Sequence, residues 1–514
     1  MRAQAREYFY DVRTHKLYYN PNATSDGPTG NEAWVATKLR TIINISASME
    51  QPAVNITIAG LTFADTRYTY LDPHGMPTGG DWALQRSGAI TAEGTVGLAI
   101  TENGTHAQPR AARPTRDSGS LSPPTLALWL LCLPGGRCAH SSCLWCRRVV
   151  GTEFTNIDGV GISLNGYHRN ATIAQNDFSL IGDSAMAAWG YTGTCLNENC
   201  TRKLPYKVGP DARGGEQPHG TLVTRNLVRE IGLWQKQSSM WFQAATATTR
   251  LVDNVHFNGP RAGVNFNDGM GGGDLMSGNL LANCVRESGD HGPFNSWDRV
   301  PVRQLVSILR PLNRPIPAAI QLGSIRRPLD SPIPGALLAL LALPEVAGSG
   351  PCVLQYITTL RNGTPSIIPA WRNITRNFVI STYASQEAID NDDGSSYYST
   401  HDNFFVYAAR GLKSDFGGHD NRHARNVYAF VNGCWENGNS DRFVNNTCVA
   451  NSKTGGFSSD CKKGPLMVVS GNTIYNEDGK LPGVKFCDTS NELAGKWPSA
   501  QQIVKMGRDV LGFP

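Results

Sequence analysis

One short phrase, an Asn followed by two or three β-branched or aromatic residues, recurs along the C-terminal part of the chain. It begins at Asn377, Asn403, Asn426, Asn446 and Asn472, with successive spacings of 26, 23, 20 and 26 along the sequence. Asn tolerates the left-handed backbone of a tight bend, its amide can hydrogen-bond the same amide one coil above, and the residues after it favour a strand. A strand motif with this period predicts stacked coils, and we expect an all-β, right-handed parallel β-helix, or β-solenoid.

Copies of the phrase upstream extend the predicted solenoid. Asn226, Asn254 and Asn279 begin it, and a weaker copy begins at Asn176, 50 residues before Asn226, which predicts two coils between these two. The 98 residues from Asn279 to Asn377 fit the period, as about two coils, only if residues 302–354 are set aside. Turn-forming residues are plentiful, with 54 Gly and 30 Pro, as several corners per coil require.

Two long stretches, residues 107–150 and 302–354, lack the phrase and have a different composition. They contain six and five Arg and no Lys, together with Pro-rich pieces and apolar runs that are too short to span a bilayer. They are either long surface loops or translated non-coding sequence, and we favour the latter because irregular loops of this length are uncommon in compact domains. Without them the remaining 417 residues carry a net charge of −3, so the +5 of the whole chain does not indicate a nucleic acid partner.

The phrase and its interruptions divide the chain into six parts. We expect N-terminal coils over 1–106, an irregular insertion over 107–150, central coils over 151–301, a second insertion over 302–354, C-terminal coils over 355–475, and a cap or tail over 476–514. The chain enters strand-like sequence almost at once and shows no signal peptide. We therefore expect that it begins inside a longer protein and that its first coils lack a cap.

Sequons and cysteines indicate an extracellular or secretory-pathway protein, which we expect to be a monomer. Asn-x-Ser/Thr sequons recur outside the insertions, among them those at Asn22, Asn44, Asn55, Asn170, Asn199, Asn362, Asn373 and Asn445. Cys195 and Cys200 flank a short polar loop and suit a disulfide. Two further bridges are expected among Cys434, Cys448, Cys461 and Cys487, while Cys284, in a strand phrase, is expected to be a buried thiol.

Several segments carry a resemblance to known β-helix proteins. These are Glu7-Tyr-Phe-Tyr-Asp-Val, Ile58-Ala-Gly-Leu-Thr-Phe, Gly182-Asp-Ser-Ala-Met-Ala-Ala-Trp-Gly and, above all, Ser288-Gly-Asp-His-Gly-Pro-Phe-Asn-Ser-Trp-Asp-Arg299. They resemble the right-handed parallel β-helix proteins of the pectate-lyase-like superfamily, and are similar to β-helix glycoside hydrolases of the fucosidase and xylanase type, family 141. The resemblance implies a carbohydrate-active protein with a polysaccharide or glycan substrate, without indicating which sugar.

Acidic residues recur at intervals close to whole coils. Asp268 and Asp290 stand 22 apart in sequence, Asp290 and Asp392 stand 49 apart once residues 302–354 are set aside, and Asp392 and Asp415 stand 23 apart. Equivalent positions on adjacent coils lie about 4.8 Å apart, so we expect these acids to project from one face. Mutual repulsion raises the pKa of one carboxyl group, as a general acid requires, and the separation selects a retaining or an inverting hydrolysis. We expect Asp392 or Asp393 to act with Asp415, and Asp290 to take part.

Other polar and aromatic residues surround these acids and are expected to bind substrate. They are Asp268, His291, Trp297, Arg299, His401, Lys413, His419 and Asp420. A purely structural interpretation, in which the acids bond turn amides, competes with this one. Besides hydrolysis, two functions stay open: a polysaccharide lyase or uronate C5-epimerase, with Ca²⁺ held by carboxylates and Lys413 or Arg299 as base, and a non-catalytic carbohydrate-binding solenoid. A hydrolase is expected to need no cofactor, and we predict no metal site, nucleic acid partner or transmembrane segment.

Overall fold

The computed structural model describes residues 8–20, 35–75, 82–102, 151–191, 215–267, 272–297, 370–381, 387–392, 394–414, 418–436, 438–451, 466–480 and 488–513. It contains two compact units, residues 1–38 and residues 39–514. In the first, β1 (Tyr8–Asp11) and β2 (Lys16–Tyr19) form an antiparallel hairpin, whereas we expected coils from the start of the chain. The predicted insertions 107–150 and 302–354 lie outside the described residues.

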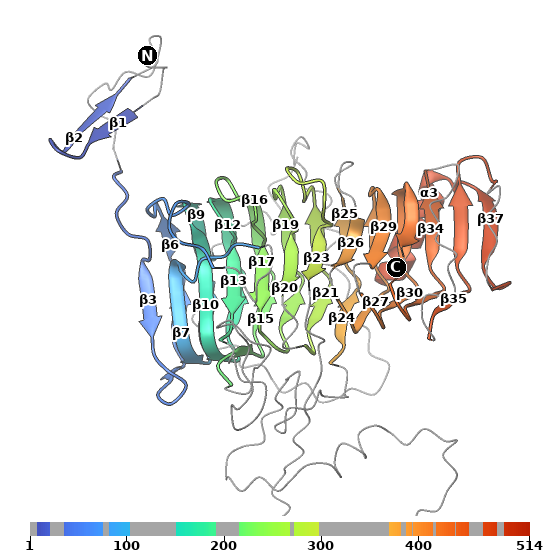
Figure 1. Cartoon of the computed structure of the whole chain (residues 1–514), viewed down its shortest axis with the longest axis horizontal. Coiled ribbons are helices and arrows are strands. Elements are labelled where there is room, and N and C mark those ends of the chain that lie inside the picture. Colours follow the sequence, from blue (N-terminus) through green and yellow to red (C-terminus); the bar gives the residue numbers. More distant parts are fainter. Residues whose placement is uncertain are drawn as a thin grey trace, which may run out of the picture. The chain divides into compact units, whose positions relative to one another are not determined.

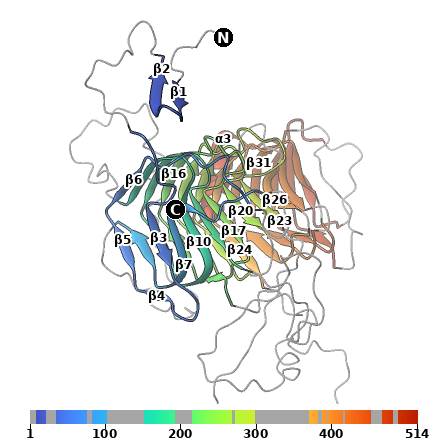
Figure 2. The same ribbon diagram turned by 60° about the vertical axis from the view of Figure 1, so that its left-hand side comes forward.

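The second unit is built from three parallel sheets, which Figures 1 and 2 show with their strands in coil order. Sheet 1 contains β3 (Ile43–Ser46), β7 (Gly88–Val96), β10 (Val160–Arg169), β13 (Met186–Trp189), β17 (Trp241–Ala244), β20 (Val264–Asn267), β23 (Phe294–Trp297), β26 (Glu387–Asp392), β29 (Arg410–Ser414) and β32 (Gly433–Glu436), with β4 (Ala53–Val54) and β14 (Pro218–His219) at its side. Sheet 2 contains β5 (Thr57–Ala59), β8 (Ala99–Thr101), β11 (Thr172–Ala174), β15 (Leu222–Thr224), β18 (Arg250–Val252), β21 (Leu275–Ser277), β24 (Arg372–Thr375), β27 (Tyr398–His401), β30 (Arg422–Ala424), β33 (Arg442–Val444) and β35 (Val468–Ser470). Sheet 3 contains β6 (Thr62–Ala64), β9 (Glu153–Ile157), β12 (Asp177–Ile181), β16 (Leu227–Ile231), β19 (Val255–Phe257), β22 (Leu280–Ala282), β25 (Phe378–Ile380), β28 (Phe404–Val406), β31 (Val427–Val431), β34 (Thr447–Ala450), β36 (Thr473–Asn476) and β37 (Glu492–Lys496).

The chain visits the sheets in the repeating order 2, 3, 1, and each strand pairs in parallel with its equivalent one coil later. Such a connection between parallel strands of one sheet is the geometry of a β-solenoid, so the predicted parallel β-helix is confirmed. Because each coil contributes one strand to each sheet, residues on neighbouring coils stack with the ordinary strand spacing of about 4.8 Å.

The repeated Asn residues form the predicted ladder at the bend between sheets 2 and 3. The left-handed backbone that we expected of the Asn lies instead at the residue before it, for example at Arg376 (φ 55°) and Asp402 (φ 57°). The Nδ2 of each donates to the Oδ1 of the next at 2.8–3.1 Å, through Asn176, Asn226, Asn254, Asn279, Asn377, Asn403, Asn426, Asn446, Asn472 and Asn491. The same oxygens also accept the backbone N–H of the preceding ladder residue, for example Asn279 to Asn377 at 3.0 Å. Apart from the Oδ1 of Asn176, at the start of the ladder, which has no partner among the described residues, these buried amides are satisfied, so the ladder holds the coils in register.

The ladder corrects two predicted coil counts. Asn176 bonds Asn226 directly and Asn279 bonds Asn377 directly, so each pair is one coil apart and the expectation of two coils between them is wrong. Strand pairing agrees, because β12 pairs with β16 and β22 pairs with β25. At both steps the extra residues stand in sequence between a strand of sheet 1 and the next strand of sheet 2, and the number of coils does not increase with them.

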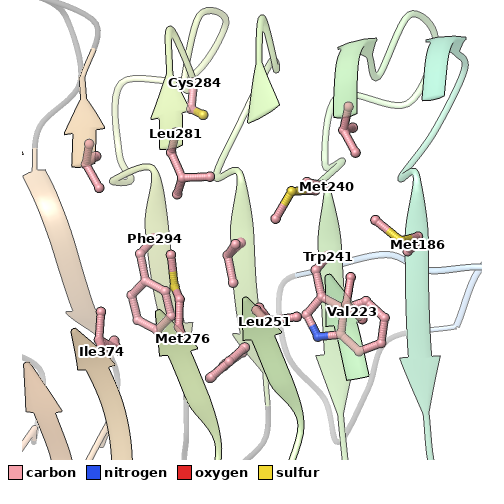
Figure 3. Packing of buried hydrophobic residues seen from close by; sticks show 14 of the residues in the cluster. Met186, Val223, Met240, Trp241, Leu251, Met276, Leu281, Cys284, Phe294 and Ile374 are labelled. Carbon is pink, nitrogen blue, oxygen red and sulfur yellow. The ribbon is translucent and has the colours of Figure 1, made fainter. Parts of the chain in front are cut away.

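The core fills the space between the three sheets. Figure 3 shows Met186, Trp241 and Phe294 of sheet 1 projecting inward beside Leu251 and Met276 of sheet 2. The predicted buried thiol of Cys284 is present and fully buried. Cys434 and Cys448 form a disulfide between β32 and β34, whereas Cys195, Cys200, Cys461 and Cys487 lie outside the described residues.

One helix, α3 (Ala500–Leu511), covers the outer face of sheet 3 near the C-terminus. It begins at a capping box on Ser499, and its Ile503 packs on the apolar outer face formed by Phe404, Val427 and neighbours. Gly507 lies so close to this face that an added Cβ would stand 2.5 Å from the ring of Phe404, which requires Gly. No helix among the described residues is long and apolar enough to cross a membrane.

Candidate functional site

Sheet 1 presents polar residues outward on four consecutive coils. Val264, Phe294, Ile389 and Leu412 belong to the core, so the residue after each points to the opposite face of the sheet. We define the first outer column as those residues: Asn265, Asn295, Asp390 and Lys413, which stand opposite one another on β20, β23, β26 and β29. Two residues further along three of these strands, Asn267, Trp297 and Asp392 form the second outer column.

Asp390 is the centre of the first outer column and is fully buried. Its Oδ2 accepts a hydrogen bond from Asn295 Nδ2 at 2.9 Å, and its Oδ1 lies 3.3 Å from Lys413 Nζ. The same Nζ lies 3.7 Å from Asp392 Oδ1, so the two carboxylate oxygens are at most about 7 Å apart. Burial raises the pKa of Asp390 well above its ordinary value, and the charges of Asp392 and Glu387 raise it further, against the opposing effect of Lys413.

An aromatic and cationic cluster adjoins the first outer column. The guanidinium of Arg261 lies 4.3 Å from the ring centroid of Trp82, and its Nη2 donates to His291 Nε2 at 2.6 Å. Trp82 also meets the His291 ring edge-on at 6.1 Å. Burial, followed by the charges of Arg261 and Lys413, lowers the pKa of His291 to about 2. The imidazole is therefore neutral, and its Nε2 accepts the hydrogen bond that Arg261 donates.

The register places Asp290 away from the two columns. Asn295 stands opposite Asn265, 30 residues earlier, and opposite Asp390, 95 residues later, so neither the 22-residue nor the 49-residue acid spacing is a coil step. Asp290 lies in the turn before β23 and is exposed. The 23-residue spacing, in contrast, is the register of β26 and β29, in which Asp390 stands opposite Lys413.

His419, Asp420 and His401 lie outside the columns. His419 Nδ1 and Asp420 Oδ2 are 2.8 Å apart at the bend that leads from β29 to sheet 2, and the imidazole meets the ring of Tyr397 edge-on. His401 lies on β27 of sheet 2, where its Nδ1 is 2.7 Å from Asp402 Oδ2. The structure thus brings Asp392, Trp297 and Lys413 together on sheet 1, places His291 just before β23, and leaves His401 on another sheet.

Four predicted residues, Asp268, Arg299, Asp393 and Asp415, lie outside the described residues. The predicted pairing of Asp392 or Asp393 with Asp415 therefore stays a prediction. Among the residues that the structure describes, no group of three or more His, Cys, Asp or Glu side chains is arranged to hold a metal ion.

The sequence pattern did not indicate Asn265, Asn295 or Arg261. A signal for the two Asn residues exists, because each stands between two inward-facing residues of a short strand, as in Val264-Asn-Phe. Only the register reveals that they align with Asp390, since the spacings between the strands differ widely. Trp82 lies 209 residues before His291, and no sequence pattern links the two.

Comparisons with known proteins add little to this geometry. No family model and no curated protein matches the chain. A solved structure titled "Glycoside hydrolase" is similar over 86% of this chain, with 10% sequence identity and a TM-score of 0.43. The match covers 56% of that protein, so this chain spans little more than half its length. The fold assignment rests on the strand pairing described above, and the predicted likeness to family 141 stays a prediction.

Proposed function

We propose that the protein is a carbohydrate-active enzyme that hydrolyses a glycosidic bond with two carboxyl groups, Asp390 and Asp392. The observation that carries the proposal is the contact of one ammonium, Lys413 Nζ, with both carboxylates on the outer face of β26, at 3.3 and 3.7 Å. Two carboxyl groups at most about 7 Å apart, in different surroundings, are the arrangement that glycoside hydrolysis uses.

The surroundings assign a role to each carboxyl group. Asp390 has a raised pKa and is fully buried, so it retains a proton that it can donate to the leaving glycosidic oxygen. Asp392 is more exposed and supplies the second carboxylate, which either attacks the anomeric carbon or takes a proton from the attacking water. A separation near 5–5.5 Å suits the first route and one of about 6.5 Å or more the second, so the anomer released first identifies the route.

The contacts of Lys413 favour hydrolysis over the lyase or epimerase alternative. A lyase needs a neutral base that takes a proton from the carbon beside a uronate carboxyl group. Lys413 is buried between two carboxylates, which stabilise its positive charge and so oppose its action as a base. The other predicted base, Arg299, lies outside the described residues. A binding solenoid, the third alternative, has no need of two carboxyl groups held by one buried ammonium on the outer face of a strand.

The test compares the whole chain with Asp390→Asn, Asp392→Asn and Lys413→Met on a panel of plant cell-wall and mucilage polysaccharides. Release of reducing ends should fall at least 100-fold in Asp390→Asn, because proton donation is worth about 10²–10⁴-fold. Asp177→Asn is the matched control, since it also removes an ion pair, with Arg229, but on the outer side of sheet 3. Unsaturated products that absorb in the near ultraviolet and vanish with EDTA would instead support the lyase. Unchanged activity in Asp390→Asn would refute the proposal.

A further inference from the structure

Asparagine amides without hydrogen-bond partners lie beside the carboxyl pair. Asn265 is fully buried and Asn267 is 1% exposed, yet neither the Oδ1 nor the Nδ2 of either side chain has a partner in the part of the chain that the structure describes. Asn295 uses its Nδ2 to donate to Asp390, and its Oδ1 has no partner there. Each unsatisfied buried polar group costs stability, so three such side chains together need an explanation.

Comparison with the ladder shows that these amides are not structural in the same way. Asn279 and Asn377 are equally buried, but their amide groups bond the neighbouring coils and backbone carbonyls. Asn265, Asn267 and Asn295 instead point outward from sheet 1, on the two coils before Asp390. Asn295 is one strand spacing from Asp390 and Asn265 is two, or about 10 Å. The unsatisfied donors and acceptors therefore lie on the same outer face of sheet 1 as the carboxyl pair, one and two coils before it.

We infer that Asn265, Asn267 and Asn295 form a binding subsite for a neutral sugar unit of the substrate. This inference rests on the proposed function and adds the class of sugar beside the cleaved bond. A sugar hydroxyl both donates and accepts a hydrogen bond, and so does a primary amide, so two whole amides and one further carbonyl oxygen suit several hydroxyls. The amides are buried, so we expect a sugar to reach them only with a local rearrangement of the protein.

The charges around the subsite favour a neutral sugar over a uronate. The amides carry no net charge, and the nearest described carboxyl groups on the next coil are Asp390, Asp392 and Glu387. The charge of Lys413 is shared between two of these. Lys413 is already paired with Asp392 and the guanidinium of Arg261 bonds His291, so the amides offer a uronate carboxylate no cation of their own, whereas neutral hydroxyls satisfy them without adding charge.

The test measures binding with cleavage switched off. In an Asp390→Asn background, neutral oligosaccharides (xylo-, cello-, manno- and galacto-oligosaccharides) and oligogalacturonates are titrated by calorimetry. Asn265→Leu, a substitution of similar shape, should weaken binding of a neutral oligosaccharide at least 10-fold without lowering the melting temperature, because it removes unsatisfied polar atoms. The matched control is Asn279→Leu in the ladder, which should lower the melting temperature because it removes satisfied hydrogen bonds.

The outcomes separate this inference from the proposed function. If Asn265→Leu leaves sugar binding unchanged, the subsite is refuted while the proposed hydrolase function stands. Such a result would indicate that only water bonds these amide groups. Binding of oligogalacturonates alone would overturn the neutral class. A lower melting temperature in Asn265→Leu would show that the amide has a structural partner and would also overturn the subsite. Binding of no oligosaccharide to any variant would count against the proposed function itself.

Discussion

Asn377 should be among the most sensitive single positions in the solenoid. Its Nδ2 donates to Met276 O, Thr375 O and Asn403 Oδ1 at 2.9–3.1 Å, and its Oδ1 accepts from the backbone and side-chain nitrogens of Asn279 at 3.0 and 2.9 Å. At about 1 kcal/mol net for each bond, Asn377→Ala should lower the free energy of unfolding by about 5 kcal/mol. The position also joins two coils whose ladder residues are 98 residues apart in sequence, so the loss falls on a contact that only the stacking of the coils creates.

Amide hydrogen exchange is the suitable assay, because a solenoid can open coil by coil and need not unfold in one step. The backbone N–H of Asn279 donates directly to Asn377 Oδ1 and reports the bond itself. If local opening becomes easier by about 4–5 kcal/mol, the exchange rate of this amide rises about 1,000-fold, since each 1.4 kcal/mol is a factor of ten. Exchange on distant coils should change much less, because coils contact only their neighbours.

Asn265→Ala is the control for this experiment. Asn265 is as buried as Asn377, but its amide has no hydrogen-bond partner among the described residues. Its replacement should therefore destabilise the fold much less than Asn377→Ala does. Equal destabilisation by the two substitutions, or an unchanged exchange rate at Asn279 in Asn377→Ala, would refute the view that amide bonding between coils, and not mere burial of Asn, stabilises the stack.

Two further predictions concern pH and redox conditions. Burial raises the pKa of Asp183 from 3.8 to about 6, so its contribution to stability is present below about pH 4 and is lost as pH rises through 6. The loss is about 3 kcal/mol for some two pKa units. The melting temperature of Asp183→Asn should therefore depend less on pH between 4 and 7 than that of the wild type, and parallel curves would contradict this. Cys434→Ser removes the disulfide between residues 14 apart in sequence and should lower the free energy of unfolding by about 3 kcal/mol. The melting temperature of the variant should be lower and should no longer respond to a reducing agent. A wild-type response to the reducing agent in the variant would exclude this disulfide as the cause of that response.

The fold could be predicted because its main signal is local. An Asn before a short apolar strand bonds the equivalent Asn of the next coil, and this recurs at the bends between sheets 2 and 3 from Asn176 to Asn491. The coil count at two steps could not be read in the same way. Residues inserted in sequence between a strand of sheet 1 and the next strand of sheet 2 add no coil, so the sequence distance from Asn279 to Asn377 does not reveal the number of coils.

The candidate site was predicted in part for a related reason. Asp392 and Lys413 are close in sequence on paired strands with no long loop between them, and the 23-residue register places them on one face. Asp290 was misplaced because the register that sets Asn265 opposite Asn295 is a longer step than the assumed spacing of 22. His401 comes shortly before β29 in sequence but lies on sheet 2, since one coil passes through all three sheets. The side of the solenoid on which a residue lies depends on its strand, and sequence distance does not report this.

The two faces of sheet 1 place different demands on the same strands. Phe294, Ile389 and Leu412 fill the core and fix the height and rotation of β23, β26 and β29. Because side chains alternate along a strand, this packing also fixes where Asn295, Asp390 and Lys413 stand on the outer face. The charged groups are thus held in place by apolar contacts that they do not make themselves, which lowers the cost of rearranging them during a reaction. A substitution in the core, such as Ile389→Ala, should therefore disturb the contact between Lys413 and Asp390 even though no charged atom is removed.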